Sequence, residues 1–157
     1  MNKNNIKDYS RKISERMWNL PDKGELESHR EETYIDDIIQ KNHIERKLLD
    51  NLEGIDTVFD AGAGSGRFSI LLAKHGCRVT HFDISQPMID KAKELAEQAG
   101  VIDRITFVKG ALEDLSGYTN KSYDMVVSFD APISYTYPNQ EHVIGELVRI
   151  AKKRIII

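Results

Sequence analysis

The N-terminal third of the chain carries two helical patterns of apolar side chains. From residue 3 to residue 20, apolar residues recur every three or four positions, which predicts one amphipathic helix. A proline and a glycine within 21–24 then interrupt the pattern. A second pattern extends over about 31–52, with a polar interruption near residue 42, so this stretch forms one helix or two. Its predicted buried residues are Tyr34, Ile35, Ile38, Ile39, Ile44, Leu48, Leu49 and Leu52.

Short apolar runs alternate with helical segments over the rest of the chain. This alternation predicts an α/β fold, in which a mainly parallel sheet has helices on both faces and right-handed crossovers. We therefore expect a single domain, with a helical cap segment at 1–53 and a core at 54–157. The predicted strands are 57–60, 79–83, 104–109, 123–129 and 154–157.

A glycine-rich loop follows the first predicted strand. That strand ends in Asp60, and Gly62, Gly64 and Gly66 come next, ahead of a helical segment. Glycines permit a sharp turn and the close approach of a ligand, and a helix N-terminus favours an anionic or polar group. The same glycines also suit a tight turn without a ligand. Asp83 ends the next strand about twenty residues on, where a carboxylate can bind both hydroxyls of a ribose.

Four stretches, 60–66, 83–85 with Met88, 107–114 and 123–129, stand in order along the predicted core. They resemble successive motifs of the class I S-adenosylmethionine-dependent methyltransferases, and the first two are the most specific. The resemblance covers about residues 42 to 157. It implies a Rossmann-like three-layer sandwich, a methyltransferase activity and S-adenosylmethionine as the cofactor.

The resemblance also implies cofactor contacts residue by residue. Gly62, Gly64 and the backbone around Ala61 would receive the methionine part, and Asp60 would orient its ammonium group. Asp83 would bind the ribose hydroxyls. The remaining predicted cofactor-binding residues are Ile84, Met88, Ala111, Leu112, Glu113 and Phe129.

One position departs from the family pattern. Many relatives carry an acid directly after the glycine of the third motif, where this chain has Ala111. The backbone of Ala111 and Leu112 can still bond the adenine ring, and Glu113 is a candidate to replace the missing acid. The alternative for Glu113 and Asp114 is a solvated turn.

The segment 130–138 is the predicted place for substrate contacts, because it follows the fourth strand at the edge where open sheets bind ligands. Asp130 or Tyr135 is a base or an orienting group there, or the segment is simply a rigid loop shaped by its prolines. It lacks the Asn-Pro-Pro-aromatic signature of enzymes that methylate exocyclic or amide nitrogens. Methyl transfer from a sulfonium requires no particular catalytic residue type, since positioning alone supplies much of the rate. The N-terminal candidates, for which core packing or a solvated face is the alternative, are Tyr9, Trp18, Arg30 and Tyr34.

Composition narrows the classes of function. The chain has 22 basic and 25 acidic residues, a net charge of −3 and no basic stripe, so no nucleic-acid partner is expected. Cys77 is the only cysteine and the histidines show no metal spacing, so we expect neither a disulfide nor a metal site. No apolar run has membrane-spanning length and no signal-like segment is visible. These features predict a soluble cytoplasmic protein that acts on a small molecule.

Two other functions are open at this point. An NAD-dependent oxidoreductase also has glycines after a strand, but in its GxGxxG pattern a glycine would replace Arg67. A non-catalytic S-adenosylmethionine-binding module or scaffold is the other alternative.

The chain ends on the apolar run 155–157, which predicts a fully buried fifth strand. The resembling family continues with a further helix and an antiparallel strand pair, which this sequence does not contain. An open apolar edge would be a pairing hazard. We therefore expect that the sequence is C-terminally incomplete, or that a partner such as a second copy covers Ile155 to Ile157.

Overall fold

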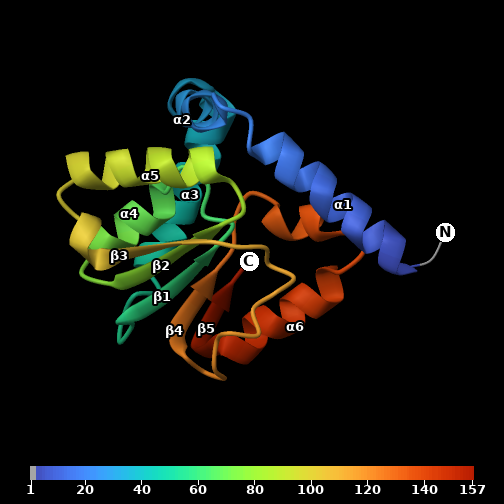
Figure 1. The fold of residues 1–157 in the computed structure, drawn as a ribbon. Helices are drawn as coiled ribbons and strands as arrows, with labels where there is room; N and C mark the ends of the chain where they lie inside the picture. Colours follow the sequence, from blue (N-terminus) through green and yellow to red (C-terminus); the bar gives the residue numbers. More distant parts are fainter. Residues whose placement is uncertain (1–2) are drawn as a thin grey trace.

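The computed structural model describes residues 3–157, without the side chains of 3–10, Glu31, Glu32 and Asp37. Five parallel strands form one sheet in the order β3-β2-β1-β4-β5 (Figure 1). The order reverses between β1 and β4, which is the switch point at which open sheets bind ligands. The strands are β1 Thr57–Ala61, β2 Arg78–Asp83, β3 Ile105–Lys109, β4 Tyr123–Val127 and β5 Ala151–Ile156.

Helices cover both faces of the sheet (Figure 1). On one face lie α4 Arg67–Lys74 and α5 Gln86–Gln98, and α6 Gln140–Ile150 covers the other. The core is accordingly divided in two, because neighbouring residues of a strand point to opposite faces. The predicted Rossmann-like three-layer sandwich is confirmed, and all strands paired within residues 3–157 are parallel.

Three helices precede the sheet, namely α1 Lys3–Trp18, α2 Lys23–Thr33 and α3 Ile35–Leu49. The helix predicted over 3–20 is confirmed. The predicted start of the second helical segment near residue 31 is wrong, because α2 already begins at Lys23. The break also lies at Tyr34, whose backbone is extended, rather than near residue 42.

Helix α2 has no apolar stripe. Polar contacts and close backbone packing hold it in place instead. Gly24 lies against α5, where an added Cβ would be 2.5 Å from the carbonyl oxygen of Pro87. An ion pair of 2.9 Å joins Lys91 of α5 to Glu25. A pattern search for apolar residues therefore cannot find this helix.

Much of the predicted buried side of α3 is exposed. Tyr34, Ile35 and Ile39 are 62%, 71% and 62% exposed, so the prediction that they are buried is wrong. Leu48 is completely buried, and Ile44 packs against the same core cluster. The apolar period gives the orientation of the helix, but not how much of its length another element covers.

The fifth strand forms, but its predicted full burial is wrong. Within the described chain β5 pairs with β4 alone, and it stands at the edge of the sheet. Ile155 and Ile157 are 36% and 57% exposed.

The carboxylate of Asp124 fastens three strands at their amino ends. Its Oδ2 accepts hydrogen bonds from the backbone N–H groups of Asp56 and Thr57, at 3.1 and 3.2 Å. Its Oδ1 lies 2.8 Å from Nζ of Lys153 on β5. The lysine, followed by the backbone donors, holds the pKa of Asp124 well below its usual range.

Replacing Asp124 with asparagine should lower the free energy of unfolding at pH 7 by about 1–3 kcal/mol, because charge-assisted hydrogen bonds are lost. A depressed folded-state pKa stabilises the fold above the unfolded pKa of about 3.9, and this contribution is lost as the pH falls. The deficit of Asp124→Asn should therefore shrink from pH 6 to pH 3 in urea unfolding. Asp103→Asn, at an exposed position, is the control. A deficit that is unchanged by acid would contradict this account.

Candidate functional site

A cavity of about 390 Å³ lies at the carboxyl ends of the strands. Its inner wall consists of the loop after β1, the end of β2 and the segments after β3 and β4. Its outer wall consists of side chains from the three N-terminal helices. This volume lies in the range of small-molecule sites. The cavity therefore occupies the switch point of the sheet.

The loop between β1 and α4 depends on its glycines. Gly62, Gly64 and Gly66 are left-handed, with φ of 73°, 57° and 87°. An added Cβ at Gly62 would lie 2.3 Å from Cβ of Pro132, and at Gly66 it would lie 2.8 Å from Cβ of Ala92. Side chains are thus excluded by conformation and by space. Gly62 and Gly64 line the cavity.

Asp83 lies at the end of β2, lines the cavity and is 8% exposed. Its Oδ2 accepts a hydrogen bond of 2.8 Å from the N–H of Gly64. Its Oδ1 accepts one of 2.8 Å from the N–H of Ser85. Burial raises the pKa of this carboxyl, and the hydrogen bonds oppose the rise. The two backbone donors fix the orientation of the carboxylate toward the cavity.

Asp60 lies at the end of β1 and also lines the cavity. Burial raises the pKa of its carboxyl to about 7, against the effect of a 2.6 Å hydrogen bond donated by Ser69 Oγ. The same hydroxyl is 3.2 Å from Nδ1 of His81, whose pKa burial lowers to about 3. Asp60 therefore titrates near neutral pH, whereas His81 stays neutral.

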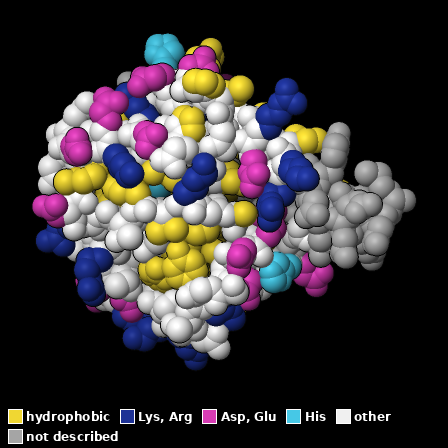
Figure 2. All heavy atoms as spheres, in the orientation of Figure 1, with side chains coloured by type: hydrophobic (Ala, Val, Ile, Leu, Met, Phe, Trp, Pro, Cys, Tyr) yellow, Lys and Arg dark blue, Asp and Glu magenta, His cyan; other side chains and the backbone are white. Residues whose placement is uncertain are grey.

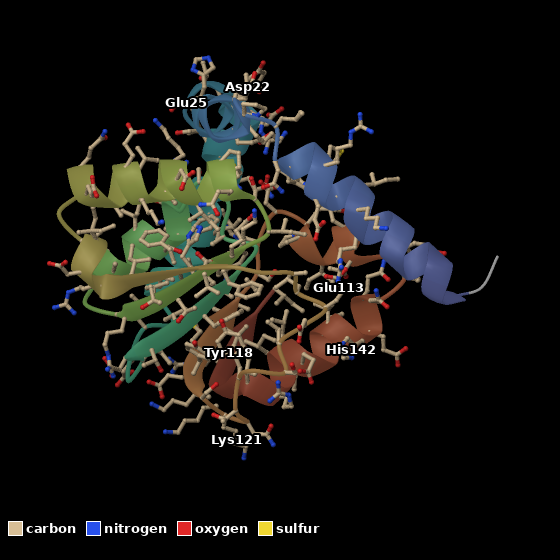
Figure 3. All side chains as sticks on the ribbon, in the orientation of Figure 1. Asp22, Glu25, Glu113, Tyr118, Lys121 and His142 are labelled. Atoms are coloured by element: carbon tan, nitrogen blue, oxygen red, sulfur yellow. The ribbon has the colours of Figure 1, made fainter. Side chains whose placement is uncertain are left out.

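The residues predicted to contact adenine come from two segments of the wall. Ile84 and Met88 follow β2, and Leu112 and Glu113 follow β3. Figure 3 shows Glu113 near His142 of α6, whose Nε2 is 3.2 Å from the carbonyl oxygen of Glu113. This contact holds the loop after β3 against α6.

The remaining predicted site residues of the 54–157 segment divide into those that line the cavity and those that do not. Phe129, Asp130 and Tyr135 line the cavity. Ala61 is completely buried in β1, and neither Ala61 nor Ala111 belongs to the cavity wall. Side-chain contacts with a ligand are thus available only to the first group.

The N-terminal candidates also divide. Trp18 and Arg30 line the cavity, and the ring of Trp18 meets that of Tyr135 edge-on at 5.3 Å. Tyr34 is 62% exposed and lies outside the wall. The side chain of Tyr9 lies outside the described residues.

The end of α1 is fastened beside Asp83. The hydroxyl of Ser85 donates to the carbonyl oxygen of Trp18. The side chain of Asn19 donates to the carbonyl of Ile84 at 3.3 Å and accepts from the N–H of Gln86 at 2.9 Å. Helix α1 is therefore held across the cavity by the loop that carries the predicted ribose acid.

Lys41 is a cavity residue that sequence reasoning missed. It has little exposure, and its Nζ lies 2.7 Å from Oδ2 of Asp130. One signal could have found it, since Lys41 lies three residues from both Ile38 and Ile44 and so interrupts the apolar stripe of α3. Other missed wall residues, Arg11, Ser14 and Met17, lie on α1.

Comparison with protein families gives a match to a methyltransferase domain over residues 58–154. The chain belongs to this methyltransferase family. Its motifs place it in the S-adenosylmethionine-dependent class, as the sequence resemblance implied.

Two curated relatives with similar sequences are methyltransferases. The chloroplastic magnesium protoporphyrin IX methyltransferase of Arabidopsis thaliana is 37% identical over 107 residues, which are 68% of this chain and 33% of the relative. The tRNA 5-carboxymethoxyuridine methyltransferase of Escherichia coli is 37% identical over 70 residues, 45% of this chain and 27% of the relative. The chain thus spans about a third or less of these two relatives.

Solved structures show the same fold. One from Methanococcus maripaludis matches with a TM-score of 0.72 at 22% identity, over 87% of this chain and 62% of the other. A methyltransferase of Geobacter sulfurreducens, crystallised with S-adenosylhomocysteine, matches with a TM-score of 0.57 at 28% identity, over 71% and 46% of the two chains.

The described residues of the methyltransferase domain contain no helix long and apolar enough to cross a membrane. Within the same part of the chain, no group of three His, Cys, Asp or Glu side chains is suited to hold a metal ion.

The cavity fits S-adenosylmethionine on three structural grounds. Gly62 and Gly64 bring backbone without a side chain to the cavity wall, where a polar ligand can approach it closely. Two buried carboxylates, Asp60 and Asp83, offer acceptors to an ammonium group and to ribose hydroxyls. Apolar side chains such as Met88 and Leu112 suit a flat ring.

The raised pKa of Asp60 predicts a stability effect with a definite sign. An acid whose folded-state pKa lies above its unfolded value stabilises the fold at low pH, and this contribution is lost as the pH rises toward the folded pKa. The variant Asp60→Asn lacks the titrating carboxyl, so its stability does not have this pH dependence. Its free energy of unfolding relative to the original chain should therefore increase by about 2–3 kcal/mol between pH 5 and pH 8.

Urea unfolding of both chains at the two pH values measures this difference, with Asp103→Asn as an exposed control. A relative stability of Asp60→Asn that falls with pH would show that the carboxyl ionises easily in the fold.

Proposed function

We propose that this domain transfers the methyl group of S-adenosylmethionine to a small-molecule acceptor. The observation that supports this most is the convergence of Asp60, Asp83 and the glycine loop on one cavity of cofactor size. The family match supports the same reaction class.

In this proposal the inner wall holds the cofactor. Asp83 binds the ribose hydroxyls, and Asp60 binds the ammonium group of the methionine part, directly or through water. Ile84, Met88 and Leu112 contact the adenine. When bound, the cofactor supplies a methyl group on a positively charged sulfur, which is open to direct displacement by a nucleophile.

The outer wall controls access to the reacting atoms. Trp18 of α1 and Tyr135 after β4 meet above the cavity, and Ser14 Oγ donates to the carbonyl oxygen of Tyr135 at 3.3 Å. In this proposal the contact between α1 and the segment after β4 helps to position an acceptor beside the methyl group. Tyr135 is 42% exposed, which leaves it accessible to an acceptor.

The distribution of charge supports a small acceptor. Figure 2 shows acidic and basic side chains interspersed on the face drawn, with no continuous basic surface there. The net charge of −3 points the same way, because nucleic-acid sites require an excess of cations. The named acceptors of the two curated relatives are a porphyrin and a tRNA nucleoside, so the family accommodates both classes.

Calorimetric titration of the chain with S-adenosylhomocysteine and with NADH tests the cofactor. We expect micromolar binding of the first, which is roughly −8 kcal/mol, and none of NADH. Asp83→Asn should weaken binding of S-adenosylhomocysteine about tenfold or more, because a charge-assisted hydrogen bond contributes about 1.5–3 kcal/mol. Asp90→Asn, at an exposed position of α5, is the matched control. Preference for NADH, or equal losses in both variants, would refute the assignment.

A further inference from the structure

A buried cation forms part of the cavity wall on the side of α3. The side chain of Lys41 is 2% exposed, and its Nζ lies 5.4 Å from the ring centroid of Phe68. Burial of an ammonium group is costly unless an anion compensates it. Asp130 provides one such anion at 2.7 Å. The position is also unusual in the sequence, because Lys41 interrupts the apolar stripe of its helix.

A second cation, Arg30 of α2, reaches the same carboxylate. Its Nη2 lies 3.4 Å from Oδ2 of Asp130, the oxygen that Lys41 also contacts. Its Nε lies 3.0 Å from Oε2 of Glu27. Both cations line the cavity. Two elements of the outer wall thus bring positive charge to one point at the end of β4.

The backbone of Asp130 is held in an uncommon conformation. Asp130 and Ala131 are consecutive non-glycine residues with φ of 66°. Such residues cost free energy and persist where the surroundings impose them. Here the conformation brings the carboxylate into contact with α2 and α3, where it fixes both cations at the cavity.

The methionine part of the cofactor carries an ammonium and a carboxylate on one carbon. The proposed function places the ammonium at Asp60, so the carboxylate needs a cation nearby. Lys41 satisfies this condition, because its side chain lines the same cavity as Asp60 and its Nζ lies over the ring of Phe68, which is also part of that wall. The inner wall supplies the acids Asp60 and Asp83 here, and its cation Arg67 is paired with Glu45 at 2.8 Å.

We propose that Lys41, with Arg30 beside it, binds the carboxylate of the cofactor's methionine part, and that Asp130 is the positioning residue for both cations. This inference rests on the proposed cofactor. It assigns Asp130 a role through Lys41 and Arg30 instead of a role as a base. A simple structural ion pair that fastens α3 to the segment after β4 is the alternative.

Two ligands separate these accounts. S-adenosylhomocysteine has the amino-acid part, whereas 5′-methylthioadenosine keeps the adenine, ribose and sulfur and lacks it. Calorimetric titration of Lys41→Met should show about tenfold or more weaker binding of S-adenosylhomocysteine and binding of 5′-methylthioadenosine within about twofold of the original chain. Lys47→Met, at an exposed position of the same helix, should change neither affinity.

Asp130→Asn should also weaken S-adenosylhomocysteine without weakening 5′-methylthioadenosine, but by less than Lys41→Met does. Lys41→Arg keeps the positive charge and should bind S-adenosylhomocysteine nearly as tightly as the original chain. Equal weakening of both ligands in Lys41→Met, or no weakening of either, would overturn the inference in favour of the structural ion pair.

Thermal unfolding shows which variants fold. If Lys41→Met does not fold, Arg30→Met decides, since the Arg30 side chain is 43% exposed and its loss is easier to accommodate. It should weaken S-adenosylhomocysteine about threefold or more and leave 5′-methylthioadenosine unchanged; an equal effect on both ligands overturns the inference. Failure of the original chain to bind S-adenosylhomocysteine would instead refute the proposed function, and this inference with it.

Discussion

The buried carboxylate of Asp83 is the constraint on which the rest of the site depends. It accepts the N–H of Gly64 on one oxygen and the N–H of Ser85 on the other, so it joins the glycine loop to the turn before α5. A buried carboxylate without such donors would be strongly destabilising. The hydrogen bonds of Asp83 therefore stabilise the left-handed conformation of the glycine loop, which forms the floor of the cavity.

The N-terminal helices complete the cavity through the same loop. Ser85 contacts both Asp83 and the end of α1, and Asn19 fixes that end against the residues on either side of Ser85. Helices α2 and α3 contribute charged side chains to the cavity wall, since Arg30 and Lys41 converge on Asp130. The outer wall thus presents charged groups at defined positions, although it is less buried than the core.

The core of this architecture could be predicted from the sequence because its signals are local. Asp60 marks the end of one strand directly before the glycines of the left-handed turn, and Asp83 marks the end of the next strand. The sheet and its switch point follow from the alternation of strands and helices. The predicted cofactor contacts stay predictions, but most of them line one cavity.

The outer wall could not be predicted because its contacts are distant in the chain. Lys41 and Asp130 are 89 positions apart, and no periodicity connects them. Helix α2 contacts α5 through the backbone at Gly24, which carries no apolar signal. The exposure of Ile35 and Ile39 likewise depends on how far α3 extends beyond its neighbours.

A crystal structure of the chain with S-adenosylhomocysteine tests the central claim most directly. The account predicts density in the cavity, with the ribose hydroxyls at Asp83 and the amino-acid part between Asp60 and Lys41. Binding of the ligand outside this cavity, or a ribose turned away from Asp83, would contradict it.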